Sequence, residues 1–232
     1  MNIDIIMASK NSIKSNLENG FYHIYNRGVG KMEIFKDEQD YDVFLNYLKE
    51  GLSSLPDKDS VPHEIYFEDR AFKVVGRMSK NFYERLVLVC YCLMPNHIHL
   101  EIKQVEINSM KDFMHSLLIR YSMYFNKKYN RVGPVFQGRY KAVYVENEMY
   151  LLYLSKYIHL NPLEISNDLT KSKSSYSDYL GLTKTLWVNT DIILSFFNKK
   201  VSSEFKKTNS YKKFVESDES NIEIIKHMAL DD

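Results

Sequence analysis

LMPNHIHLEI, residues 93–102, carries two histidines on alternate positions of an otherwise apolar run. The Met-Pro-Asn turn is followed by alternating residues, and alternation predicts a β-strand. One face of that strand carries Ile98, Leu100 and Ile102, and the other carries His97, His99 and Glu101. Two imidazoles on one strand face can reach one metal ion. The solvated face of an amphipathic strand gives the same pattern, so His-x-His alone leaves both interpretations open.

The surrounding chain predicts further strands and helices around this turn. Strands are expected at 21–28, 85–93, 97–103 and 139–146, and helices at 40–52, 109–130 and 147–162. Ser109 and Asn147 are candidate helix N-caps, and Pro162 should end the last helix. This order predicts an α+β fold: a ferredoxin-like β-α-β-β-α-β antiparallel sheet, followed by one more helix. Because the first and third strands are central in that plan, the histidines should face water from mid-sheet.

Two segments lie outside this plan or extend it. Residues 53–80 mix prolines, serines and charges with one alternating piece, and we interpret them as an insertion. The chain after 165 predicts a loop followed by small helices. We therefore expect a main domain over 1–165 and a C-terminal helical extension over 166–232.

The charge distribution points to a nucleic acid more than the net charge does. The 232 residues contain 31 Lys and Arg against 30 Asp and Glu, yet between residues 111 and 145 the only acid is Asp112. Basic residues interleaved with tyrosines suit a phosphate backbone with stackable bases. A solvated helix face with core aromatics behind it explains the stretch equally well.

Cysteine content and apolar runs indicate the compartment. Cys90 and Cys92 are the only cysteines, and two positions apart on one strand they are poorly placed to bond with each other. The N-terminus lacks the pattern of a signal peptide, and no apolar run is long enough for a membrane span. We therefore expect a soluble cytoplasmic protein.

Five motifs in order give the chain a family resemblance. They are YHIYNRG (22–28), CLMPNHIHL (92–100), GPVFQGRYKAV (133–143), YIHLNP (157–162) and SSYSDYLG (174–181). Together they resemble the single-tyrosine transposases of the HUH endonuclease superfamily, above all the REP-associated tyrosine transposases. The resemblance runs from about Phe21 to Val215.

The resemblance implies a transposase or nicking endonuclease acting on single-stranded DNA with hairpin or palindromic repeats. It implies that His97, His99 and Asn161 hold Mg²⁺ or Mn²⁺ and that Tyr157 attacks the DNA, leaving a 5′-phosphotyrosine. It leaves open a monomer and a homodimer that exchanges tyrosine helices. The long 53–80 segment departs from the pattern, because it is usually short in relatives.

The chemistry is reasonable on physical grounds. Neutral imidazoles and an amide oxygen leave a divalent ion its full charge for a phosphate, and a covalent tyrosine link conserves bond energy for rejoining. Glu101 shares the histidine face, where simple solvation is the favoured interpretation. The candidate DNA-backbone contacts are Arg27, Arg120, Arg139 and Lys141.

Three tyrosines share the last predicted helix: Tyr150, Tyr153 and Tyr157. Tyr157 lies one turn from Asn161, whereas Tyr153 lies two turns away, roughly 12 Å along the axis. The position before Pro162 should push Asn161 out of helical geometry.

Three other functions are compatible with parts of the sequence. A histidine-triad nucleotide hydrolase needs a third histidine where Glu101 stands. A zinc site could be built from Cys90, Cys92, His97 and His99 if both pairs faced one side of the hairpin. A domesticated DNA-binding protein without cleavage is the third alternative.

Overall fold

The computed structural model describes residues 16–54, 63–67, 70–74, 80–198 and 211–217. Its main element is a four-stranded antiparallel sheet in the order β4-β5-β1-β6. The strands are β1 (Gly20–Arg27), β4 (Leu86–Met94), β5 (His97–Gln104) and β6 (Lys141–Val145). β1 and β5 are central, so the predicted ferredoxin-like arrangement of the sheet is confirmed.

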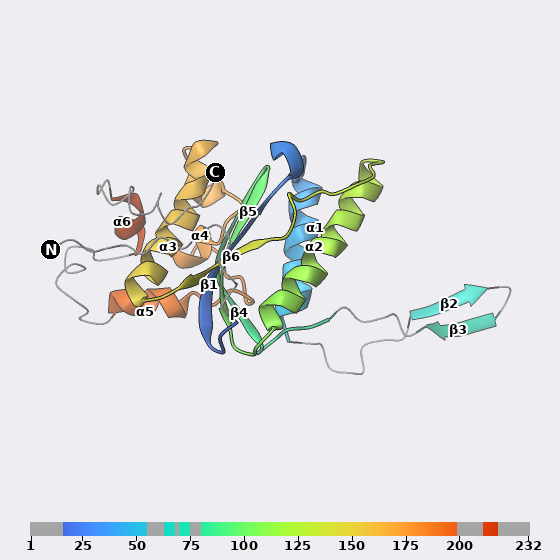
Figure 1. The fold of residues 1–232 in the computed structure, drawn as a ribbon, viewed down its shortest axis with the longest axis horizontal. Helices are drawn as coiled ribbons and strands as arrows, with labels where there is room; N and C mark the ends of the chain where they lie inside the picture. Colours follow the sequence, from blue (N-terminus) through green and yellow to red (C-terminus); the bar gives the residue numbers. More distant parts are fainter. Residues whose placement is uncertain (1–15, 55–62, 68–69, 75–79, 199–210, 218–232) are drawn as a thin grey trace.

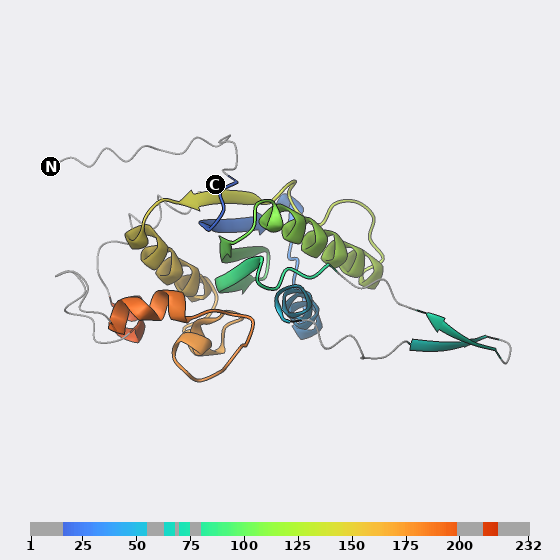
Figure 2. The same cartoon turned by 90° about the horizontal axis from the view of Figure 1, so that it is seen from below.

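Helices cover both faces of the sheet, giving three layers (Figures 1 and 2). α1 (Glu38–Leu52) and α2 (Ser109–Lys128) lie on one face. The other is covered by α3 (Glu148–Leu160), α4 (Tyr176–Tyr179), α5 (Asp191–Asn198) and α6 (Tyr211–Glu216). Short 3₁₀ turns occur at Val29–Lys31, Asn161–Glu164 and Leu169–Lys171.

Alternation along the strands gives the two faces different chemistry. Ile24, Ile98 and Leu100 point toward α1 and α2 and are fully buried with Phe44 and Tyr121. Full burial of a large apolar side chain contributes about 1.5–3 kcal/mol before entropy, so this face carries much of the stability. The opposite face is partly polar and contains the histidines.

The Pro95–Asn96 turn between β4 and β5 precedes His97 and is held by the chain that follows β1. β4 ends at Met94, β5 begins at His97, and the two residues pair across the Pro95–Asn96 turn. The Pro95 carbonyl accepts hydrogen bonds from the backbone N–H groups of Ile34 and Phe35, at 2.7 and 3.0 Å. These bonds fix the turn, and with it the start of β5.

The C-terminal chain covers the outer edge of β4. Leu93 N–H donates to the Lys173 carbonyl at 2.8 Å, and Asn189 N–H donates to the Leu88 carbonyl at 2.8 Å. In α3, both nitrogens of the buried His159 are bonded, to the Tyr211 hydroxyl at 2.6 Å and the Ser175 hydroxyl at 2.9 Å. The extension is therefore tied to the sheet edge and to α3.

Some local expectations need correction. Asn147 caps α3 as predicted, its side chain accepting from Tyr150 N–H, but Ser109 is not the cap of α2. Asn108 occupies that position with φ 67°, and the Ser109 hydroxyl donates to the Arg85 and Glu106 carbonyls instead. Tertiary acceptors are thus preferred over a local cap.

The segment predicted as an insertion contains a strand pair. β2 (His63–Phe67) and β3 (Arg70–Val74) pair antiparallel with each other and form a separate two-stranded sheet. The rest of 55–79 lies outside the described residues. Across the described parts of the chain, none of the helices has the length and apolar character needed to cross a membrane.

Asp40 of α1 is hydrogen-bonded to residues at the end of α2 and just beyond it. Its buried carboxylate accepts from Lys128 Nζ, Tyr124 and Tyr129 at 2.7–2.9 Å. Although burial opposes ionisation, these bonds and the Lys36 backbone N–H hold its pKa below the usual value. Its contribution is therefore present above about pH 4 and is lost as the pH falls through the folded-state pKa.

Asp40→Asn should lower the free energy of unfolding by about 2 kcal/mol at pH 7, because charge-assisted bonds are lost. Asp42→Asn, an exposed change on the same helix, is the control and should be near neutral. Urea denaturation of both variants at pH 7 measures the difference. Equal stabilities would show that the Asp40 cluster contributes nothing.

Candidate functional site

Three neighbouring strands contribute polar side chains to one face of the sheet. In the β1–β5 pairing Tyr25 is opposite His99, and in the β4–β5 pairing Cys92 is opposite His99. Opposite residues of paired strands point to the same face. The histidines therefore have aromatic neighbours on one side and thiols on the other.

This face is buried under α3, contrary to the expectation that the histidines face water. His99 and Glu101 are fully buried, and His97 and Asn161 are each 7% exposed. The predicted order of four strands and two helices specified the sheet, but not that the next helix would return across it. His97 and Asn161 keep slight exposure because they lie where α3 ends, beside the hairpin.

α3 brings Asn161 and Tyr157 to the histidines. Asn161 Oδ1 is 3.5 Å from His97 Nε2, and the Tyr157 ring meets the His99 ring edge-on with centroids 5.5 Å apart. Asn161 remains helical (φ −47°, ψ −41°), so the expected departure before Pro162 is wrong. The proline ring fits because the chain continues as a 3₁₀ turn from Asn161, with Pro162 in its first turn.

The orientation of two side chains indicates a place for a cation. Asn161 Nδ2 donates to the Tyr157 carbonyl at 3.0 Å, which turns Oδ1 toward His97. His97 Nδ1 lies 2.6 Å from Asn96 Oδ1, an acceptor, so Nδ1 carries the proton. In a neutral imidazole the lone pair of Nε2 then faces the lone pairs of Asn161 Oδ1. A cation between them would be attracted to both atoms.

His99 has the charge state that a metal ligand requires. Burial, followed by the nearby His23, His97 and Arg27, holds its pKa well below the usual value, so the ring is neutral. Its Nδ1 is 2.9 Å from His23 Nε2, so a metal ion would be bound through Nε2. Two imidazoles and an amide oxygen are donors that fit a divalent metal ion, but imidazole suits several such ions, so the donor set does not name the metal.

The three tyrosines of α3 have different surroundings. Tyr153 packs against Phe214 of α6, with ring centroids 5.4 Å apart. Burial raises the pKa of Tyr150 to about 12, which disfavours the phenolate there. Tyr157 is the one with ring contacts to His99 and to His23, the latter at 6.0 Å. Lys156 points elsewhere, donating to the Ser217 carbonyl at 3.1 Å.

His23 and Tyr25 were not among the predicted site residues. Tyr25 stacks on His99 with centroids 6.1 Å apart, and His23 is hydrogen-bonded to the same ring. The available signal was a histidine and a tyrosine in alternate positions of the first central strand. Placing them beside His99 requires the register of the β1–β5 pair, which cannot be read from the sequence.

Glu101 and the cysteines form the inner part of this face. The Cys90 thiol donates to Glu101 Oε2 at 3.1 Å, and burial raises the pKa of Glu101 to about 8. The expected solvation of Glu101 is therefore wrong. Cys90 and Cys92 are free thiols, and burial raises the pKa of each. Among the described residues, no three His, Cys, Asp or Glu are grouped to hold a metal.

The candidate DNA-contact residues divide into two groups. Arg27 pairs with His97 across the strands, and Lys141 Nζ lies 5.3 Å from the centre of the Tyr25 ring, so both are near the histidines. Arg139 is exposed two residues before Lys141. Arg120 instead pairs with Glu50 and stacks on Tyr47 between α1 and α2, on the opposite face of the sheet.

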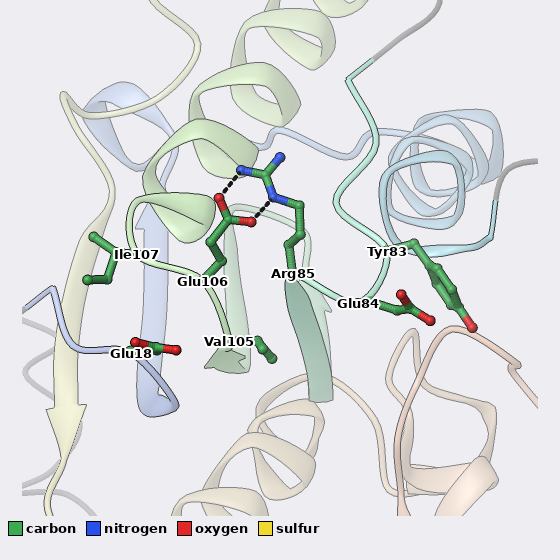
Figure 3. Close-up of a pocket in the computed structure, with 7 residues that line it drawn as sticks. All are labelled: Glu18, Tyr83, Glu84, Arg85, Val105, Glu106 and Ile107. Carbon is green, nitrogen blue, oxygen red and sulfur yellow. Dashed lines mark hydrogen bonds and ion pairs between the residues drawn. The ribbon is translucent and has the colours of Figure 1, made fainter.

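A surface depression of about 580 Å³ lies at the other end of β5 (Figure 3). It is lined by Glu18, Tyr83, Glu84, Arg85, Val105, Glu106 and Ile107, with Arg85 and Glu106 paired across it. His97 begins β5, whereas Val105, Glu106 and Ile107 of the depression follow its last residue, so the depression is separate from the histidine site.

The face thus brings two histidines, an amide and a helix-borne tyrosine together, and comparisons with known proteins show what the chain is similar to. Residues 64–161 match the family model of IS200-like transposases. The fold is similar to a solved REP-associated tyrosine transposase bound to a REP hairpin, with a TM-score of 0.50 and 10% identity. That match covers 78% of this chain and 98% of the other. No curated protein matches the sequence.

The predicted resemblance to the single-tyrosine transposases is thus confirmed, with the sequence match over 64–161 and the fold match over most of the chain. The sequence match begins within β2, so it includes part of the segment interpreted as an insertion, and it ends at Asn161.

Metal binding by this donor set is directly measurable. His97→Ala and Asn161→Ala should each raise the Kd for Mn²⁺ by at least about tenfold, because each removes one donor atom. Electron paramagnetic resonance of free Mn²⁺ gives that Kd. His115→Ala, an exposed histidine on α2, is the control. Unchanged Mn²⁺ affinity in both site variants would remove these residues from any metal site.

Proposed function

We propose that the protein is a metal-dependent transposase or nicking endonuclease that cuts and rejoins single-stranded DNA at hairpin or palindromic repeats. The observation that carries this proposal is the meeting of residues 97–99 with Tyr157 and Asn161, from segments that only the fold brings together. The IS200-like transposase match supports the general activity. The solved neighbour's REP hairpin supports a hairpin substrate.

In the proposed reaction, the Tyr157 oxygen attacks a backbone phosphorus. The phenol loses its proton, a Tyr–O–P bond forms, and the bond from phosphorus to the 3′-oxygen breaks. The 3′-oxygen takes up a proton and leaves as a hydroxyl, while the 5′-phosphate stays on Tyr157. Attack by another 3′-hydroxyl reverses these bond changes and rejoins the DNA.

His97, His99 and Asn161 would hold Mg²⁺ or Mn²⁺ beside this phosphate. When bound, the ion supplies positive charge that offsets the phosphate charge and stabilises the leaving oxygen. The residues themselves contribute neutral donors in fixed orientations, since Asn96 and the Tyr157 carbonyl hold the His97 ring and the Asn161 amide. Preset donors avoid reorganisation during the reaction.

The proposed site can be assembled within one chain, because Tyr157 contacts His99 of the same chain through α3. A homodimer that exchanges tyrosine helices would bring the same residue types together. We further propose that residues 1–165 form the catalytic unit and 166–232 a C-terminal extension. In this proposal the extension holds α3 in place, because His159 of α3 is hydrogen-bonded to Ser175 and Tyr211.

Tyr157→Phe should abolish the covalent protein–DNA adduct, because the attacking oxygen is removed. Single-stranded hairpin DNA, Mn²⁺ and a denaturing gel measure the adduct. Tyr153→Phe is the matched control and should still form it, since that ring packs on Phe214. An adduct on Tyr157→Phe would overturn the assignment. If the native protein binds this DNA without forming an adduct under any divalent metal, the domesticated DNA-binding alternative stands.

DNA binding should involve Arg27, Arg139 and Lys141 on the histidine side. The pairing of Arg120 with Glu50 gives no support to its predicted DNA contact. Reversing Arg139 and Lys141 to Glu should flatten the log–log salt dependence of single-stranded DNA affinity by about 1.4, the effect of two lost phosphate contacts.

Fluorescence anisotropy at several salt concentrations measures this slope. Reversal of Lys171 and Lys184, two exposed lysines of the C-terminal extension, makes the same change in net charge and serves as the control. An identical slope in the two double variants would exclude Arg139 and Lys141 from the interface.

A further inference from the structure

His23 is a buried polar residue in contact with a candidate metal ligand. It lies in β1, is 1% exposed, and its Nε2 is 2.9 Å from Nδ1 of His99. The two rings are nearly parallel, with an interplanar angle of 17° and centroids 5.2 Å apart. A hydrogen bond between two buried imidazoles requires one ring to donate and the other to accept.

The strand register fixes this contact. Tyr25 is directly opposite His99, and His23 is opposite Glu101, so His23 is the diagonal neighbour of His99 on the same face. The Tyr25 ring stacks on His99 with centroids 6.1 Å apart and lies tilted against His23 at 5.0 Å. The position of His23 is therefore set by the central strand pair and by an aromatic neighbour.

We propose that His23 is a positioning residue for His99. It accepts a hydrogen bond from the Nδ1–H of His99, which places the lone pair of His99 on Nε2 and directs that atom to the metal. This inference rests on the proposed function, because it assigns His23 a task in the same metal site.

The arrangement around His97 supports the direction of the bond. His97 Nδ1 is held by Asn96 Oδ1, an acceptor, and its Nε2 faces Asn161. A metal-binding histidine commonly donates its other N–H to a neighbouring acceptor, which fixes the ring and raises the basicity of the coordinating nitrogen. Each of the two histidines would then have one supporting acceptor, Asn96 for His97 and His23 for His99.

His23 differs from an ordinary core residue in what can replace it. Glutamine reaches a similar distance, and its carbonyl oxygen can accept the bond from His99. Leucine fills a comparable volume and accepts nothing, so it would leave the His99 N–H buried without an acceptor. His23→Gln and His23→Leu therefore separate the hydrogen bond from packing.

The Kd for Mn²⁺ by electron paramagnetic resonance is the decisive measurement. We expect His23→Leu to raise it about 10- to 100-fold, the range found for the loss of such supporting partners. His23→Gln should remain within about threefold of the native protein. Thermal unfolding and metal-free DNA binding serve as controls for folding, and both should be similar in the two variants.

In the metal-binding measurement, the inference is overturned by native Mn²⁺ affinity in a folded His23→Leu protein, or by equal weakening in the Gln and Leu variants. If the native protein itself binds no Mn²⁺, the proposed metal-dependent function fails together with the role of His23. If the native protein binds Mn²⁺ and the two variants do not differ, only the role of His23 fails.

A measurement on the native protein covers the case in which His23→Leu does not fold. Long-range ¹H–¹⁵N spectra of the imidazoles identify which nitrogen of His99 carries the proton. Protonation at Nδ1 is the expected result, and protonation at Nε2 in the neutral ring would overturn the inference.

Discussion

The packing of α3 across the polar face of the sheet is the contact on which the candidate site depends. Without it, the histidines would be an exposed pair on a strand, and Tyr157 and Asn161 would have no fixed place beside them. The contact is maintained from both sides: Leu154 and Ile158 bury apolar surface against the sheet, and His159 bonds to the C-terminal chain. Small shifts of α3 would therefore directly change the distance between Tyr157 and the histidines.

The two faces of the sheet differ in polarity: one carries the apolar core, and the other carries the histidines. Under α1 and α2 the core is almost entirely apolar, apart from bonded groups such as the Tyr121 hydroxyl. Under α3 several polar groups are buried, which costs free energy unless they are hydrogen-bonded. The bonds between His23 and His99 and between Cys90 and Glu101 reduce that cost. The free energy gained by apolar burial on one face can therefore offset the remaining cost of burying polar groups on the other.

Much of this arrangement was predictable because it follows from periodicity. The alternation in 97–102 specifies which residues share a face, and the order of strands and helices specifies which strands are central. The position of α3 is not encoded in either pattern, so the burial of His99 and Glu101 was missed. The Asn161 geometry was missed because a helix can continue as a 3₁₀ turn at a proline. His23 required the strand register, which depends on pairing between segments about 76 residues apart.

The covered edge of β4 has a consequence for self-association. Unpaired edge strands invite strand addition by another molecule, which leads to aggregation. Residues 173 and 189 occupy backbone groups of β4, so that edge is capped within the chain itself. The opposite edge strand, β6, is five residues long and begins with the exposed Lys141. Short length and a charged side chain discourage sheet extension, so a lysine proposed to contact DNA also keeps neighbouring copies from joining their sheets.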